Sequence, residues 1–222
     1  MFTFLSSIDI LIEEIDSMKS WIIFLVGSII SFNSLAQSNV TENLTLVSEI
    51  KQNVDPLARN TQLIWQYNKI CEALARHKDP RTEVYLDTLE TMARASNWDM
   101  AMGLYFRAMG RYHDFADDYQ PVLEYYQQAL DELKYAKGDG KELAFTYVLK
   151  GFFLSNSELH QECWKTLEEG LSYARKAKSK NSLCLMLDWF GDYYYFGLDG
   201  EIDNKKALDY YLQVNRILPQ IS

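Results

Sequence analysis

Residues that interrupt helices are scarce in this chain of 222 residues, which contains only 10 glycines and 4 prolines. A fold built from many strands needs frequent turns, and turns draw heavily on both residue types. Apolar side chains make up 48% of the sequence and aromatic ones 14%, which is enough to build a substantial core. The composition therefore excludes an intrinsically disordered chain and favours long helices over a β fold.

Positive charge and cysteine are also in short supply. Lys and Arg number 22 against 31 Asp and Glu, which gives a formal net charge of −9. An acidic protein repels a phosphate backbone, so we expect no nucleic-acid partner. The 3 cysteines are too few and too widely spaced for a disulfide framework or a metal motif, and we predict that Cys71, Cys163 and Cys184 are buried free thiols.

The N-terminal 36 residues have the three parts of a secretory signal peptide. Lys19 precedes an uncharged apolar run at residues 21–32, which is too short to span a bilayer comfortably, and small residues then lead to Ala36. Because residues 1–17 are acidic where a signal peptide is basic, we predict that the true start is Met18. We therefore expect an exported protein, periplasmic or extracellular. The alternatives are a membrane anchor formed by residues 21–36 and a buried N-terminal helix.

Self-comparison gives the strongest pattern, because a unit of two amphipathic helices recurs three times within residues 98–222. Each first helix carries a glycine, and these are Gly110, Gly151 and Gly191, at spacings of 41 and 40 residues. Each second helix carries a large residue and, three positions later, a smaller one. The second helix of the third unit comes four residues later because a glycine-rich turn at residues 197–200 is inserted before it.

These positions resemble the tetratricopeptide repeat, although the units are longer than the 34 residues typical of that family. The resemblance implies an all-α fold, a right-handed superhelical array of antiparallel helix pairs. It divides the chain into a linker at residues 37–55, a degenerate first pair at 56–97, where Lys69 replaces the glycine, and three pairs at 98–222. The implied packing residues are Gly110, Tyr126, Ala129, Gly151, Leu167, Gly170, Gly191, Ala207 and Tyr211.

The resemblance also implies a groove that binds a protein or peptide and is lined by the outward residues of the first helices. Two arginines lie one turn apart at one end and two aspartates at the other, so we expect these charges and the phenylalanines between them to hold an extended peptide. Merely solvated helix faces are the alternative. On this interpretation, reversing both arginine charges leaves folding nearly unchanged. The implied groove residues are Arg107, Arg111, Asp114, Phe145, Phe152, Asn156, Asp188, Asp192 and Tyr195.

The sequence shows no catalytic or metal-binding constellation. His77, His113 and His160 stand in unrelated contexts, without the spacing of a helical zinc site. We therefore predict no enzymatic activity, no metal and no cofactor. In the aromatic run at residues 189–196, we expect Phe190 and Tyr194 to face the core, whereas the residues that follow them face elsewhere.

The predicted function is an exported module for interaction with a protein or peptide. Analogy of fold suggests the sensing or scaffold part of a larger bacterial membrane signalling protein. Membrane contact is expected only through an uncleaved N-terminal segment or a region beyond Ser222. The alternatives are a scaffold that self-associates through its C-terminal helix, which carries Leu208 and Leu212, and a helical enzyme with an unrecognised site.

Export gives a first testable prediction. The mature protein is expected to begin at Gln37, because cleavage follows the small residue at Ala36. N-terminal sequencing of protein recovered from the exported fraction checks this. Protein that begins at Met1, or that stays in the cytosol, contradicts it.

Overall fold

The computed structural model describes residues 40–52, 56–138, 140–177, 179–198 and 201–220. Every regular element in these ranges is a helix, so the chain is all-α, as predicted. Residues 40–52 form a first helical stretch. The helices after it are α2 (Pro56–Arg76), α3 (Arg81–Ala95), α4 (Ala101–Phe115), α5 (Val122–Leu133), α6 (Lys141–Asn156), α7 (His160–Ala177), α8 (Lys180–Tyr195), α9 (Asn204–Ile217) and the short 3-10 helix η1 (Leu218–Gln220).

Side-chain caps define where α8 and α9 begin. Ser179 caps α8 by accepting a hydrogen bond from the Ser182 amide at 3.2 Å. Asp203 caps α9 by accepting one from the Lys206 amide at 3.0 Å. Because these acceptors satisfy amides that have no partner within the helix, each helix starts at a defined residue.

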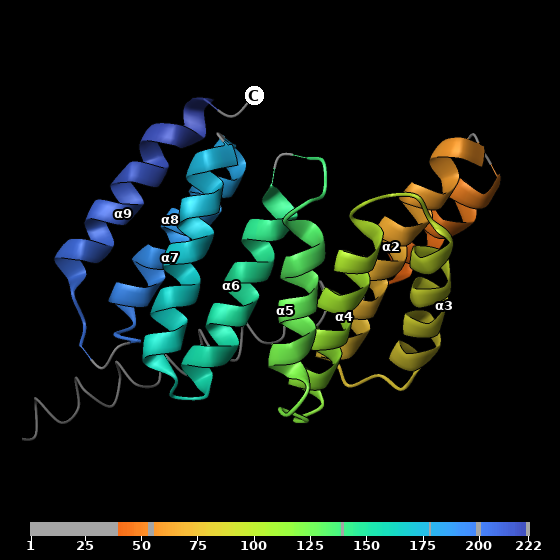
Figure 1. Cartoon of the computed structure of the whole chain (residues 1–222), viewed down its shortest axis with the longest axis horizontal. Coiled ribbons are helices and arrows are strands. Elements are labelled where there is room, and N and C mark those ends of the chain that lie inside the picture. The colour runs from red at the N-terminus through yellow and green to blue at the C-terminus, as the bar shows by residue number, and fades with distance from the viewer. Residues whose placement is uncertain (1–39, 53–55, 139, 178, 199–200, 221–222) are drawn as a thin grey trace, which may run out of the picture.

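The helices lie side by side along the molecule, from α2 and α3 at one end to α9 at the other (Figure 1). The most extensive packing is between α4 and α5, between α6 and α7, and between α8 and α9. Further packing joins α2 to α4 and α6 to α8. One buried cluster spans α2 to α4 and another runs from α5 to α9, with a small third cluster between α5 and α6.

A glycine lies against a large side chain in each of the three most closely packed pairs. A Cβ atom added at any of these glycines would approach the facing side chain more closely than 3.0 Å, a separation that real Cβ atoms essentially never show. The two backbones therefore approach closely, and the large side chain fills the space where a Cβ would stand. The contacts are Gly110 with Tyr126, Gly151 with Leu167, and Gly191 with Tyr211.

The second helices contribute small residues of their own. Ala129 is fully buried in α5. A Cβ atom at Gly170 of α7 would lie 2.8 Å both from Tyr147 of α6 and from Met186 of α8. Gly170 thus lets one helix before it and one after it approach α7, which ties consecutive pairs together.

The prediction of a linker over residues 37–55 is wrong for residues 40–52, which are helical. Val40, Val47 and Ile50 are buried there and belong to the cluster that includes α2 and α4. Their spacing is that of one helix face, so this stretch is part of the core. The remainder of the predicted linker and the predicted signal peptide lie outside the described residues. No helix within the described ranges is long and apolar enough to cross a membrane.

Gly151→Leu tests the glycine contact. The added side chain must displace the buried Leu167, so the free energy of unfolding is expected to fall by about 1–3 kcal/mol in urea denaturation. Gly138→Leu is the matched control, because Gly138 is exposed and a Cβ there would meet only the Met100 sulfur, at 3.8 Å. Equal losses of stability in the two variants would contradict the close approach.

Candidate functional site

Arg107 was expected to be exposed in a ligand groove, and that expectation is wrong, because its side chain is only 3% exposed. Its Nε donates to Glu72 Oε1 at 2.8 Å and its Nη1 to Glu142 Oε2 at 2.5 Å. Its Nη2 donates to Asn68 Oδ1 at 2.8 Å, and its guanidinium lies 5.1 Å from the centre of the Phe145 ring. One side chain of α4 therefore joins α2, which carries Glu72 and Asn68, to α6.

The carboxylates around Arg107 keep it charged. Burial acts to lower the pKa of Arg107, but the nearby Glu72 and Glu142 outweigh that effect, so the pKa is raised. A buried charge that loses its partners is strongly unfavourable. The expectation that Arg107 can be reversed without affecting the fold is therefore also overturned.

Arg111 is buried as well, with 9% of the residue exposed. Its guanidinium lies 4.2 Å from the centre of the Phe115 ring and 3.7 Å from a carboxylate oxygen of Asp114. Burial raises the pKa of Asp114, and Arg111 partly counteracts that shift. Neither predicted arginine is free to receive a peptide carboxylate, so the predicted arrangement of opposite charges at the two ends of a groove does not exist.

The other predicted residues divide by exposure. Phe145 is half-buried beneath Arg107. Phe152 is 40% exposed and packs edge-on against Trp189, with 5.6 Å between the ring centres. Because α6 packs against α8, five of the predicted residues lie on two neighbouring helices. We call these five the acidic–aromatic surface: Phe152, Asn156, Asp188, Asp192 and Tyr195.

Acidic character on this surface comes from one face of α8. Asp188 is exposed on this face. Its pKa is raised by the partial burial of its carboxyl group and by the negative charge of the neighbouring Asp192. Asp192 is half-buried and accepts a hydrogen bond from the Tyr211 hydroxyl at 2.6 Å. Tyr195 is 51% exposed. This face therefore presents one exposed carboxylate, one carboxylate held by Tyr211 and an aromatic ring.

The aromatic run on α8 divides as the pattern predicted. Phe190 and Tyr194 are buried and stack on Tyr210 of α9, at centre-to-centre distances of 5.2 and 5.8 Å. Tyr195 and Phe196 lie on another face and are 51% and 63% exposed. The exposed pair is thus not required for the packing of α8 against α9.

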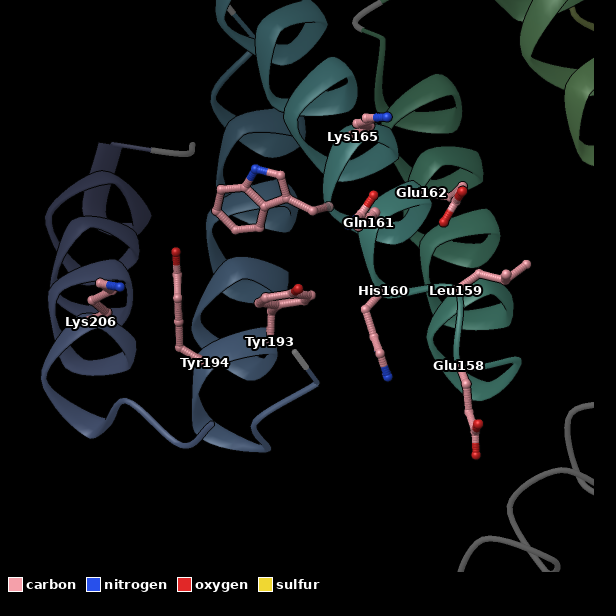
Figure 2. Close-up of a pocket in the computed structure, with 10 residues that line it drawn as sticks. Glu158, Leu159, His160, Gln161, Glu162, Lys165, Tyr193, Tyr194 and Lys206 are labelled. Atoms are coloured by element: carbon pink, nitrogen blue, oxygen red, sulfur yellow. The ribbon is translucent and has the colours of Figure 1, made fainter. Parts of the chain in front are cut away.

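A cleft of about 760 Å³ between the N-terminal ends of α7 and α9 was not predicted (Figure 2). Tyr193 and Tyr194 of α8 lie between those ends, and the Lys206 ammonium is 4.7 Å from the centre of the Tyr194 ring. The rings are already used by the core, since Trp164 packs against Tyr193 at 5.4 Å and both tyrosines are buried. His160 also lines this cleft, and its Nδ1 has no hydrogen-bond partner. Two features of the sequence lie in its lining, namely His160 and the aromatic run that contains Tyr193 and Tyr194.

The cysteines and His113 belong to residue types that often act in catalysis or metal binding, but here their side chains pack within the fold. All three cysteines are buried free thiols, as predicted, and burial raises the pKa of Cys163 to about 11. His113 Nδ1 lies 2.8 Å from Asp118, and its ring stacks on Tyr125 at 5.2 Å. Within the described part of the chain, no group of three or more metal-ligating side chains occurs.

Comparisons with family models, with curated proteins and with solved structures found no match to this chain. Function must therefore be argued from its surfaces.

Arg107→Met tests the buried bridge. Methionine keeps the helix propensity but leaves Glu72, Glu142 and Asn68 without their donor, so the free energy of unfolding is expected to fall by about 3–5 kcal/mol. Arg94→Met is the control on α3, where the arginine is 62% exposed and pairs only with Glu90, one turn away. Its loss is expected to stay below about 1 kcal/mol. If both variants lose a similar free energy of unfolding in urea denaturation, the contacts of Arg107 with α2 and α6 do not stabilise the fold.

Proposed function

We propose that this chain is a module for binding a protein or peptide, built as a right-handed superhelical array of antiparallel helix pairs of the tetratricopeptide type. The recurring glycine contact supports the repeat, because it joins equivalent residues in α4 and α5, in α6 and α7, and in α8 and α9. In this proposal α2 and α3 form the degenerate first pair, and the helical residues 40–52 precede it. Export by a signal peptide at residues 1–36 remains part of the proposal.

The distribution of exposed apolar side chains carries the functional proposal. Among the described residues, 11 large apolar side chains are exposed, and 8 of them lie between residues 152 and 218. Scattered exposed apolar residues are ordinary, but their concentration in one part of a molecule is typical of an interaction site. The acidic–aromatic surface lies within this region, and two of its residues, Phe152 and Tyr195, are among the eight.

The chemistry of the acidic–aromatic surface indicates the ligand class. Asp188 and Asp192 offer two carboxylates one helical turn apart, with Phe152 on the neighbouring helix. Such a surface favours a peptide that carries Lys or Arg beside an apolar side chain, because opposite charge adds specificity and apolar contact adds affinity. With both arginines buried, the ligand is not expected to need an acidic segment.

Selection of peptides from a displayed random library tests this proposal. The purified protein is expected to enrich peptides that contain Lys or Arg next to a large apolar residue. Binding of an enriched peptide to the variant Phe152→Ser, Tyr195→Ser should weaken by about tenfold, roughly 1.4 kcal/mol. Urea denaturation checks that this variant stays folded, because Phe152 also packs against Trp189.

Tyr135→Ser provides the matched control, since Tyr135 is an aromatic residue that is 87% exposed outside this surface. Titration calorimetry compares the three proteins. If no peptide is enriched, or if the double variant binds as well as the wild type, the acidic–aromatic surface is not the binding site.

A further inference from the structure

Helix α9 presents an apolar face that no described helix covers. It packs on α8 and on the short η1, and it lies at one end of the row of helices (Figure 1). Leu208, Leu212 and Leu218 are 56%, 42% and 51% exposed. The first two are one turn apart, so they form a continuous stripe. We call the surface formed by these leucines and the adjacent side of α8, with Asp188, the end face.

Earlier units show what occupies the equivalent face. Leu208 corresponds to Trp164 of α7 and Leu123 of α5, by the repeat spacings of 44 and 41 residues. Trp164 packs edge-on against Phe190 of the following helix α8, with 5.1 Å between the ring centres. Leu123 packs against the cluster that contains Phe153 of the following helix α6. In both units, therefore, another helix covers the position that Leu208 leaves open.

Leu218 carries less of this argument. It lies in η1 and is 51% exposed, whereas the equivalent residues Ala174 of α7 and Leu133 of α5 are only 2% and 4% exposed. Leu133, however, is covered within its own pair, because its side chain fills the space beside Gly103 of α4. It is at Leu208 that the end face continues a packing pattern that two earlier units complete with a following helix. Continuity of this kind specifies the shape of the missing occupant, which is an amphipathic helix.

Charge specifies the occupant further. Asp188 stands at the position that Arg107 occupies in α4, and Arg107 pairs with Glu142 in the first turn of the following helix α6. A helix that docks on α8 as α6 docks on α4 brings its first turn to Asp188. With an aspartate in place of an arginine, an acid at that point is repelled and a base is attracted.

We propose that the end face binds an amphipathic helix of another protein, which places large apolar residues on Leu208 and Leu212 and a lysine or arginine of its first turn beside Asp188. The proposal rests on the repeat array proposed above. The end face shares Asp188 with the acidic–aromatic surface, but the variant Phe152→Ser, Tyr195→Ser alters only the second of these, so the two sites can still be tested separately.

The probe is a synthetic peptide that copies residues 141–157, which contain α6, because α6 already fits the equivalent surface within this chain. One version keeps Glu142 and a second carries Glu142→Lys. Fluorescence anisotropy with the full-length protein is expected to show that the lysine peptide binds about tenfold more tightly. The variant Asp188→Arg restores the charge found at Arg107 and should reverse this preference.

Variants separate the two sites. Leu208→Ser, Leu212→Ser is expected to abolish binding of both peptides while the circular dichroism spectrum stays unchanged, because both leucines are exposed. The variant Phe152→Ser, Tyr195→Ser is expected to bind both peptides normally. Loss of peptide binding in this second variant, with the leucine variant unaffected, would assign the helix to the acidic–aromatic surface and overturn the proposal.

Three other results overturn it. The first is that neither peptide binds the wild-type protein. The second is that Asp188→Arg leaves the preference between the two peptides unchanged. The third is a dimer in light scattering that Leu208→Ser, Leu212→Ser converts to a monomer, because a second copy of the chain would then cover the end face. If the library selection enriches no peptide but Asp188→Arg reverses the preference between the two α6 peptides, only the acidic–aromatic site is refuted.

Discussion

The close approach of two helix backbones at a glycine is the constraint on which the rest of this structure depends. At Gly151 the backbone of α6 leaves no room for a Cβ atom, because Leu167 of α7 fills that space. The same contact recurs at Gly110 and Gly191, so it is found in three helix pairs. Gly170 of α7 adds a further close approach, because it faces both Tyr147 of α6 and Met186 of α8 and so joins two of these pairs.

The position of Arg107 in α4 has an equivalent in α6 and in α8, and each helix holds a different kind of residue there. In α4 it holds Arg107, whose buried charge joins three helices. In α6 it holds Val148, which is 2% exposed and purely apolar. In α8 it holds Asp188, which is exposed. The first two residues are buried between neighbouring helices, whereas the third is exposed.

The all-α class and the glycine contacts could be predicted from the sequence, because helix-breaking residues are rare and the glycines repeat at nearly constant spacing. The candidate site could not, since sequence alone does not show whether an arginine on a helix faces water or two carboxylates on other helices. Glu72 and Glu142, both 35 residues from Arg107, were a signal only in retrospect. The helix at residues 40–52 is hard to predict because its sequence is largely polar, as in a linker, and its apolar face is formed by only a few residues such as Val40, Val47 and Ile50.

The most direct measurement of the central claim is a double-mutant cycle at Gly151 and Leu167. Leu167→Ala alone should cost about 2–5 kcal/mol, because it leaves a cavity beside the glycine. Gly151→Ala should destabilise the wild type but be tolerated in the Leu167→Ala background, where the new methyl group enters that cavity. The account predicts a coupling energy of about 1 kcal/mol or more from urea denaturation. An equal effect of Gly151→Ala in both backgrounds would contradict it.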